Sequence, residues 1–223
     1  MAFPTVAAGT PAESITTITP VIGTHAAGSW LLAHIEVPTT APLTPVGWDL
    51  LYSVPSTAGN TRICLYTRLA TSSSETDPTF VVISDHIWGV VYVINGAHQT
   101  KPFSTSASFP PATSTAAIWP GVTTDSADNL LFYLLAWQID NAGPIGSAEA
   151  NATLANIAEV IDAGSALGNG GGGLSWTGEK ATAGIVDPAT ATVTSTAMAV
   201  VTLAIQPPAV VASIGPTIWV EGM

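Results

Sequence analysis

The sequence TRICLYTRL at residues 61–69 decides the predicted fold, because its side chains alternate in type from one residue to the next. Successive side chains of a β-strand point to opposite faces, so one face would carry Ile63, Leu65 and Leu69. The opposite face would carry a more polar set, namely Arg62, Cys64, Tyr66 and Arg68. An antiparallel strand with one face in a core and the other in solvent has this pattern. The stretch therefore predicts an antiparallel β-protein.

Apolar segments of strand length lie on both sides of this stretch, and turn residues separate them. On the N-terminal side they are SWLLAHIEV at residues 29–37, closed by Pro38, and WDLLY at residues 48–52. On the C-terminal side they are residues 79–83, 87–94, 117–119, 130–139 and 191–205. The run LLFYLLAWQI at residues 130–139 fits a central strand or a buried helix, and its aromatic residues and the flanking asparagines favour the strand.

Two segments depart from the strand pattern. Residues 148–158 are the best candidate for a helix, and the glycine-rich residues 164–173 predict a flexible loop. No repeat with a period of roughly 20 to 50 residues is found, which disfavours solenoids and propellers. Short strands separated by turns at intervals of roughly 8 to 15 residues predict an all-β fold, an antiparallel β-sandwich of the jelly-roll type.

We expect three regions along the chain. Residues 1–27 would form an extended N-terminal arm with a first edge strand, and residues 28–208 would form the sandwich. Residues 209–223 would form an apolar C-terminal arm, which begins AVVASIGPTIWV. An exposed apolar arm is unfavourable unless it docks on something, so it either folds back on its own sandwich or reaches a neighbouring subunit.

The composition is poor in charge and strongly acidic. Only 9% of the 223 residues are charged, against about 25% in an average soluble domain, while 47% are hydrophobic. The formal net charge is −11, because 15 acidic residues outnumber four basic ones: Arg62, Arg68, Lys101 and Lys180. Nucleic acids and anionic membrane surfaces attract clusters of Lys and Arg, so we exclude both as direct partners.

Three further features concern the cellular compartment. Residues 188–220 carry no charge, but the prolines within them interrupt any membrane-spanning helix. The N-terminal residues lack the basic start and apolar run of a signal peptide, so we expect none. Cys64 is the only cysteine, which fits folding in a reducing cytoplasm.

The residues that carry catalysis in other proteins occur here in the wrong context. Residues 164–168 (GSALG) place Ser165 one position too early for the nucleophile of a hydrolase. Cys64 lies in the middle of an alternating strand, where a structural cysteine is expected. Glu75 and Asp77 lie between serines and Pro78, which indicates a solvated turn instead of a glycosidase carboxylate pair. We therefore expect no enzymatic activity.

Metal and cofactor motifs fail on context too. The four histidines, His25, His34, His86 and His98, include no closely spaced pair of ligands. Asp85 and His86 are adjacent, so in a strand they would point to opposite faces. The glycines at positions 168, 170 and 173 match the spacing of a dinucleotide fingerprint, but no strand–turn–helix pattern surrounds them. We expect neither a metal nor a cofactor.

Tryptophans are the natural recognition residues in a chain with so little charge. Trp30, Trp88 and Trp137 lie inside predicted strands and are assigned to the core. Trp119, Trp176 and Trp219 lie near predicted loops or ends, where an indole ring serves a protein interface or stacks on a sugar. Together with apolar residues of the C-terminal arm they give the candidate interface: Trp119, Trp176, Ile214, Ile218, Trp219 and Val220.

Two stretches resemble the jelly-roll modules of tailed-bacteriophage virion proteins. PVGWDLLYS at residues 45–53 is similar to their P-x-G-W-x-L-L-x-S turn and strand, and TRICLYTRLA at residues 61–70 to their T-R-x-x-x-Y-x-x-x-A strand. Residues 91–97 and 193–208 fit the later strands approximately. The resemblance covers residues 28–208 and implies a fold more directly than a role, since no catalytic or binding residues come with it.

The function expected from this resemblance is structural. The first expectation is a head decoration protein that stabilises the capsid, and the second is a tail, baseplate or fibre component. Its partners would be other virion proteins, either the major capsid protein or tail proteins, and further copies of itself. It would be localised in the virion after assembly in the bacterial cytoplasm. The alternative class is a carbohydrate-binding adhesin that uses exposed tryptophans to bind a host glycan.

Overall fold

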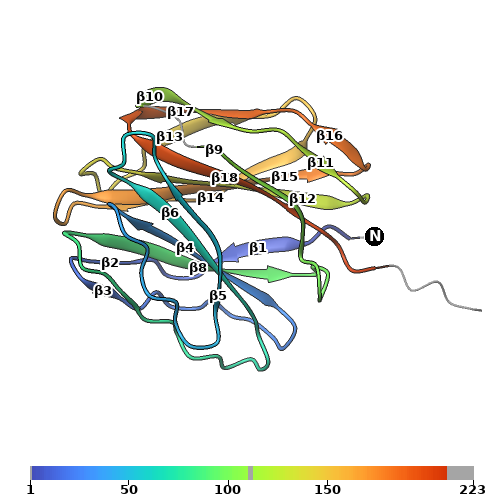
Figure 1. The fold of residues 1–223 in the computed structure, drawn as a ribbon. Helices are drawn as coiled ribbons and strands as arrows, with labels where there is room; N and C mark the ends of the chain where they lie inside the picture. The colour runs from blue at the N-terminus through green and yellow to red at the C-terminus, as the bar shows by residue number, and fades with distance from the viewer. Residues whose placement is uncertain (1, 110–112, 210–223) are drawn as a thin grey trace, which may run out of the picture.

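The structure, a computed structural model, describes residues 2–109 and 113–209. Within these residues the chain forms eighteen strands and no helix, and every strand pairing is antiparallel (Figure 1). The predicted all-β, antiparallel fold class is therefore confirmed. The order of the strands does not establish the jelly-roll connectivity.

The first half of the chain forms one large sheet with the order β1-β8-β4-β6-β5, and β2 also pairs with β8. Its strands are β1 (Thr5–Ala8), β2 (Ala12–Ser14), β4 (Trp30–Val37), β5 (Asp49–Pro55), β6 (Arg62–Leu69) and β8 (Ile87–Asn95). A two-stranded sheet of β3 (Thr17–Ile18) and β7 (Phe80–Val81) lies outside it. We call these elements the first unit.

The second half forms a large sheet with the order β14-β15-β12-β18-β9. Its strands are β9 (Phe103–Phe109), β12 (Asn129–Trp137), β14 (Ala155–Ser165), β15 (Gly171–Lys180) and β18 (Met198–Ile205). Outside it lie the sheet β10-β17-β13 and the sheet β11-β16, formed by β10 (Ser114–Trp119), β11 (Val122–Thr124), β13 (Gly146–Ala150), β16 (Gly184–Val186) and β17 (Ala189–Thr196). We call these elements the second unit.

The two units repeat one topology. In each large sheet the N-terminal strand pairs with the last strand, followed by the first, third and second of the remaining strands. Triples of paired residues that correspond in the two sheets are Trp30–Leu69–Ile94 and Leu130–Glu179–Ile205. A residue of β4 thus corresponds to the residue of β12 one hundred positions later. The period far exceeds that of the repeats considered in the sequence, and the side chains of the two copies differ.

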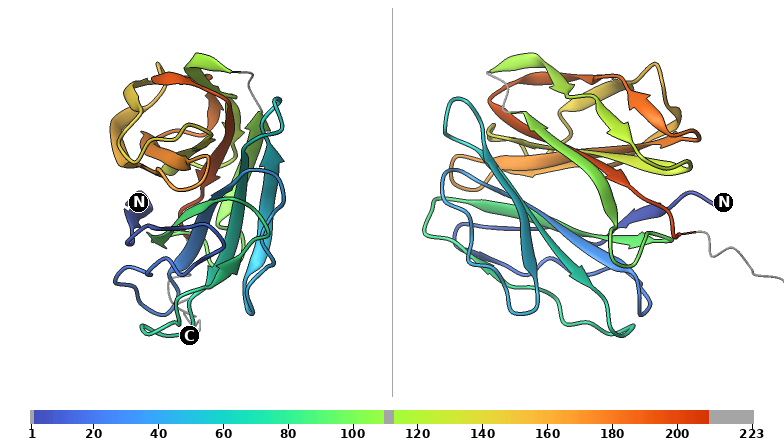
Figure 2. Two further views of the ribbon diagram at one scale, coloured as in Figure 1. Left: turned by 90° about the vertical axis from the view of Figure 1, so that its left-hand side faces the viewer. Right: turned by 45° about the vertical axis from the view of Figure 1, so that its right-hand side comes forward.

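The units pack so that corresponding faces meet. Leu32 and the corresponding Phe132 both lie in the apolar core shared by the two large sheets, which we call the shared core. Their neighbours Leu31 and Leu131 point the other way, into the separate outer cores of the two units. The molecule therefore has four layers, and both large sheets are buried on both faces (Figure 2).

This layering changes the interpretation of β6. Its alternation is as predicted, with Ile63 and Leu65 in the shared core. However, Cys64 and Tyr66 on the opposite face are fully buried in the outer core of the first unit, so the expectation of a solvated face was wrong. The reason is non-local: β3, β7 and the connection from β4 to β5 cover that face.

Three other predicted segments are corrected. Residues 148–158 form no helix but the end of β13 and the start of β14, with positive φ at Ala148 and Asn156. The predicted loop 164–173 is shorter, because Gly171 begins β15. The backbone at Gly173 approaches the first sheet so closely that a Cβ there would overlap Trp88, so a glycine is required. The predicted strand 191–205 is two strands, β17 and β18, interrupted at Ala197.

We expect that Phe132→Ala will lower the free energy of unfolding by about 3–5 kcal/mol, because it empties a fully buried position between the two large sheets. Urea denaturation followed by circular dichroism measures this change. Val46→Ala is the control, since Val46 is 97% exposed and should change stability by less than about 0.5 kcal/mol. A cost below about 1 kcal/mol for Phe132→Ala would contradict the shared core.

Candidate binding cleft and buried ion pair

Two tryptophans of the predicted interface are core residues. Trp119 and Trp176 are both fully buried in the outer core of the second unit. The indole Nε1 of Trp119 donates a hydrogen bond to the carbonyl oxygen of Leu134 at 2.9 Å, and Trp176 stacks on Tyr133 with ring centroids 4.0 Å apart. Their assignment to an exposed interface is corrected, because β10 and β15 carry them inward. The other four candidates, Ile214, Ile218, Trp219 and Val220, lie outside the described residues.

The three tryptophans assigned to the core behave less uniformly. Trp88 and Trp137 are fully buried, as predicted. Trp30 is half-buried, and its Nε1 donates to the carbonyl oxygen of His98 at 3.1 Å. These five described tryptophans therefore do not identify a surface site, and the candidate site has to be found from the exposed residues.

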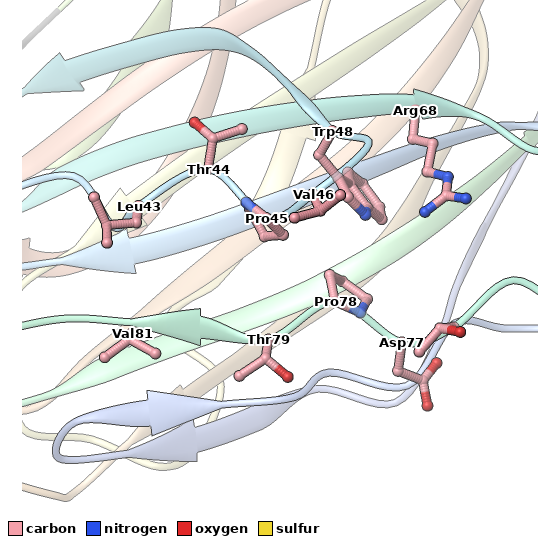
Figure 3. A pocket seen from close by; sticks show the side chains of 11 residues that line it. Leu43, Thr44, Pro45, Val46, Trp48, Arg68, Asp77, Pro78, Thr79 and Val81 are labelled. Atoms are coloured by element: carbon pink, nitrogen blue, oxygen red, sulfur yellow. The ribbon is translucent and has the colours of Figure 1, made fainter.

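The surface of the first unit is hollowed between two connections, and we call this hollow the cleft. One wall is the connection from β4 to β5, residues 38–48, and the other is the connection from β6 to β8, residues 70–86. The cleft has a volume of about 560 Å³, and a second hollow of about 520 Å³ shares two of its lining residues (Figure 3). Residues on the two walls include Leu43, Pro45, Val46, Trp48, Pro78 and Val81.

The cleft displays aliphatic side chains to solvent. Leu43 is 83% exposed and Val46 is 97% exposed on the first wall. On the second wall Val81 is 49% exposed, and Ile83, which lines the adjoining hollow, is fully exposed. Single exposed aliphatic residues are ordinary, but four of them around two adjoining hollows form a candidate interaction surface.

Side chains of β6 hold the first wall in place. The hydroxyl of Tyr66 donates to the carbonyl oxygen of Pro42 at 2.7 Å, and Nε of Arg62 donates to that of Thr39 at 2.6 Å. Gly47 has a φ of 79°, and a Cβ at this position would lie 3.4 Å from the guanidinium of Arg68. Residues 45–48 of the first stretch that resembles phage proteins therefore belong to this wall, and side chains of the second stretch, 61–70, support it.

Acidic side chains hold the second wall. Glu75 forms an ion pair with Arg68 and accepts hydrogen bonds from the backbone N–H groups of Thr71 and Ser72. The bonds from Thr71 are the main reason why the pKa of Glu75 lies below its usual range. Asp77 accepts a hydrogen bond from the backbone N–H of Ile22 at 2.8 Å. Hydrogen bonds and an ion pair within the first unit thus hold both walls in place.

A second constellation lies at the junction of the two units. Glu36 and His86 are fully buried, with Oε2 of Glu36 3.1 Å from Nε2 of His86. Thr61 donates to Oε1 of Glu36 at 2.8 Å, and Nδ1 of His86 lies 3.0 Å from Oδ1 of Asp85. A Cβ at Gly171 of the second unit would overlap Glu36, so the glycine-rich segment closes this site.

This constellation is missed in the sequence for a specific reason. Asp85 and His86 were expected on opposite faces of a strand, but both precede β8, which begins at Ile87, and the loop backbone lets the two side chains meet. Glu36 lies within the apolar strand β4, where a lone acid gives no sign of a partner 50 residues away. His86 is buried, and its two ring nitrogens lie 3.1 Å and 3.0 Å from carboxylate oxygens of Glu36 and Asp85.

The environment changes the proton affinities of both groups. Burial raises the pKa of Glu36 to about 7, although His86 and Thr61 act to lower it. Burial acts to lower the pKa of His86, but Glu36 and Asp85 outweigh it, and the pKa of His86 is raised. Both shifts favour the protonated forms, inside a site from which solvent is excluded.

The thiol of Cys64 is likewise enclosed. Cys64 is buried, and burial raises the pKa of its thiol to about 12, so the thiol stays protonated. Among the described residues no group of three or more His, Cys, Asp or Glu side chains is placed to hold a metal ion. Nor does the described part of the chain contain a helix with the length and apolar character needed to span a membrane.

Comparison of the chain with protein-family models, curated proteins and solved structures found no match.

The buried pair should make stability depend on pH. The carboxyl of Glu36 ionises near pH 4.5 when unfolded and near 7 when folded, so the folded state holds the extra proton between these values. The raised pKa of His86 acts with the same sign, and its contribution is present below pH 6.5 and is lost as the pH rises. The free energy of unfolding should therefore fall between pH 5 and pH 8, by up to about 1.4 kcal/mol per pH unit for each proton.

Urea denaturation at several pH values tests this expectation. Glu36→Gln keeps the shape of the side chain and should flatten the fall in stability with pH. Glu13→Gln, at an exposed position, is the control and should leave the fall unchanged. If Glu36→Gln and the unaltered chain show the same slope, the proton is not held at Glu36.

Proposed function

We propose that this chain is a non-enzymatic bacteriophage virion structural protein, in the first place a head decoration protein. The observation that carries the proposal is the cleft, because the two stretches that resemble phage virion proteins supply part of its lining and the supports of one wall. Val46 and Trp48 of the first stretch line the cleft, and Arg62 and Tyr66 of the second hold its wall. We also propose that the fold is related to the jelly-roll modules that these stretches resemble.

The mechanism would be burial of aliphatic surface between virion subunits. Transfer of a Leu, Val or Ile side chain from water to an apolar interface contributes roughly 1.5–3 kcal/mol. Leu43, Val46 and Ile83 are exposed enough to supply most of that amount when covered. Because the walls are already fixed, little of this free energy would be spent on ordering them.

The charge of the chain suits assembly by apolar contact. A formal net charge of −11 makes free copies repel one another and keeps them soluble. Salt screens this repulsion but leaves apolar burial intact, so association through the cleft would strengthen as ionic strength rises. Contacts made mainly by ion pairs would show the opposite dependence.

A tail, baseplate or fibre component remains the second form of the proposal, because the same cleft would serve in either location. For the adhesin alternative, Trp119 and Trp176 are buried and cannot stack on a glycan, and Trp219 lies outside the described residues.

Particle analysis tests the proposal. Particles of a phage whose genome encodes the chain are purified on a density gradient, and their proteins are quantified by mass spectrometry. We expect many copies of the chain per particle, and antibody labelling in the electron microscope should place them on the head. Presence only in the soluble fraction would contradict the proposal, and labelling of the tail would favour its second form.

Substitution in the cleft tests the mechanism. Val46→Asp places a carboxylate where apolar burial is proposed, and it should reduce incorporation into particles at least about tenfold. The matched control is Ile185→Asp, which alters a 71% exposed aliphatic residue of the second unit. Equal incorporation of the two variants would show that the cleft is not the docking surface.

A further inference from the structure

The repeated topology shows what is missing at the cleft. In the second unit the connection from β12 to β14 contains β13, and the connection from β15 to β18 contains β17. These two strands pair with each other and close the outer layer. The corresponding connections of the first unit, residues 38–48 and 70–86, are both described, and no strand pairing joins them. The cleft therefore lies where the second unit is closed by paired strands.

One wall of the cleft ends in an unpaired strand edge. Within the described residues β7 pairs only with β3, so its other edge faces the cleft without a strand partner (Figure 3). Val81 of β7 and Leu43 across the cleft supply apolar contacts beside that edge. An open strand edge next to apolar side chains is the arrangement that binds an extended peptide by strand addition.

The chain itself contains a segment suited to this site. Residues 209–220 read AVVASIGPTIWV and carry no charge. Within them residues 217–220 (TIWV) are all β-branched or aromatic, the types that favour a strand. A segment without charge suits a cleft that is bordered by aliphatic side chains.

We propose that residues 217–220 of a neighbouring copy bind in the cleft as an added strand on β7. In one orientation of the added strand Ile218 and Val220 would cover Leu43, Val46 and Val81. In the other orientation Trp219 would cover them. The proposal rests on the proposed function in one respect, since an assembly protein needs contacts between its copies. It names the partner of the cleft as a second copy of this chain.

The reach of the segment favours a neighbouring copy over the same copy. The segment follows β18, which lies in the second large sheet, whereas the cleft lies beyond the first large sheet. Two sheet spacings of about 10 Å each separate them even in a straight line through the protein. Residues 209–216 span at most about 28 Å when fully extended, which exceeds the two spacings by less than one more spacing, so a path around the first unit to their own cleft leaves little slack.

Sedimentation equilibrium of the full chain tests the proposal. We expect the average mass to rise with concentration above that of a monomer. Val46→Asp in the cleft and Ile218→Asp in the segment should each weaken this association at least about tenfold, because each places a carboxylate in an apolar contact. Ile185→Asp is the control and should associate like the unaltered chain. Circular dichroism checks that each variant is folded.

Mixing the two defective variants separates the alternatives. The Val46→Asp chain keeps an intact segment and the Ile218→Asp chain keeps an intact cleft, so an equal mixture should recover heterodimers. Deuterium exchange should slow at residues 79–83 of the Ile218→Asp partner in that mixture. A monomeric unaltered chain, or a mixture that forms no heterodimer, would overturn the proposal, including the case in which the segment occupies its own cleft.

The results also separate this inference from the proposed function. A chain that is present in virions but does not associate through residues 217–220 would leave the virion function standing and remove the inference. A chain that associates as proposed but is absent from virions would do the reverse.

Discussion

The structure depends on the shared core between the two large sheets. Leu32 and Phe132 both lie in it, and the sheets approach so closely at Trp88 that the facing position must be Gly173. Each sheet is then covered on its other face by its own outer layer, which gives every central strand two buried faces. A chain with only 9% charged residues can satisfy this requirement, because few of its side chains need solvent.

The two units cover the outer faces of their large sheets differently, and this difference leaves the cleft in the first unit. In the second unit the pairing of β13 with β17 completes the outer layer. In the first unit the corresponding connections are held apart, with Tyr66 bound to Pro42 on one side and Glu75 bound to Arg68 on the other. The repeated topology therefore leaves an exposed apolar cleft in the first unit, and this supports the proposed role in assembly.

The ion pair of Glu36 and His86 is the exception within this apolar framework. Enclosing two ionisable groups costs more than placing aliphatic residues there, so their presence is better explained by specificity than by stability. Thr61 donates a hydrogen bond to Oε1 of Glu36, and Asp85 lies within hydrogen-bonding distance of Nδ1 of His86. On the other side of the pair, the backbone of Gly171 lies so close to Glu36 that no side chain fits there. We infer that the pair fixes how the first unit meets the glycine-rich segment of the second.

The sequence by itself determined the fold class and most central strands, since a period of two or an apolar run records how each residue sits in its own strand. Residues 61–69 and 130–139 were assigned to strands correctly for this reason. Tertiary structure alone decided the layers, the repeated topology and the burial of Trp119 and Trp176, because each depends on elements distant in the chain. The same holds for the cleft: its two walls are separated in sequence, and only the packing of both against one sheet brings them together.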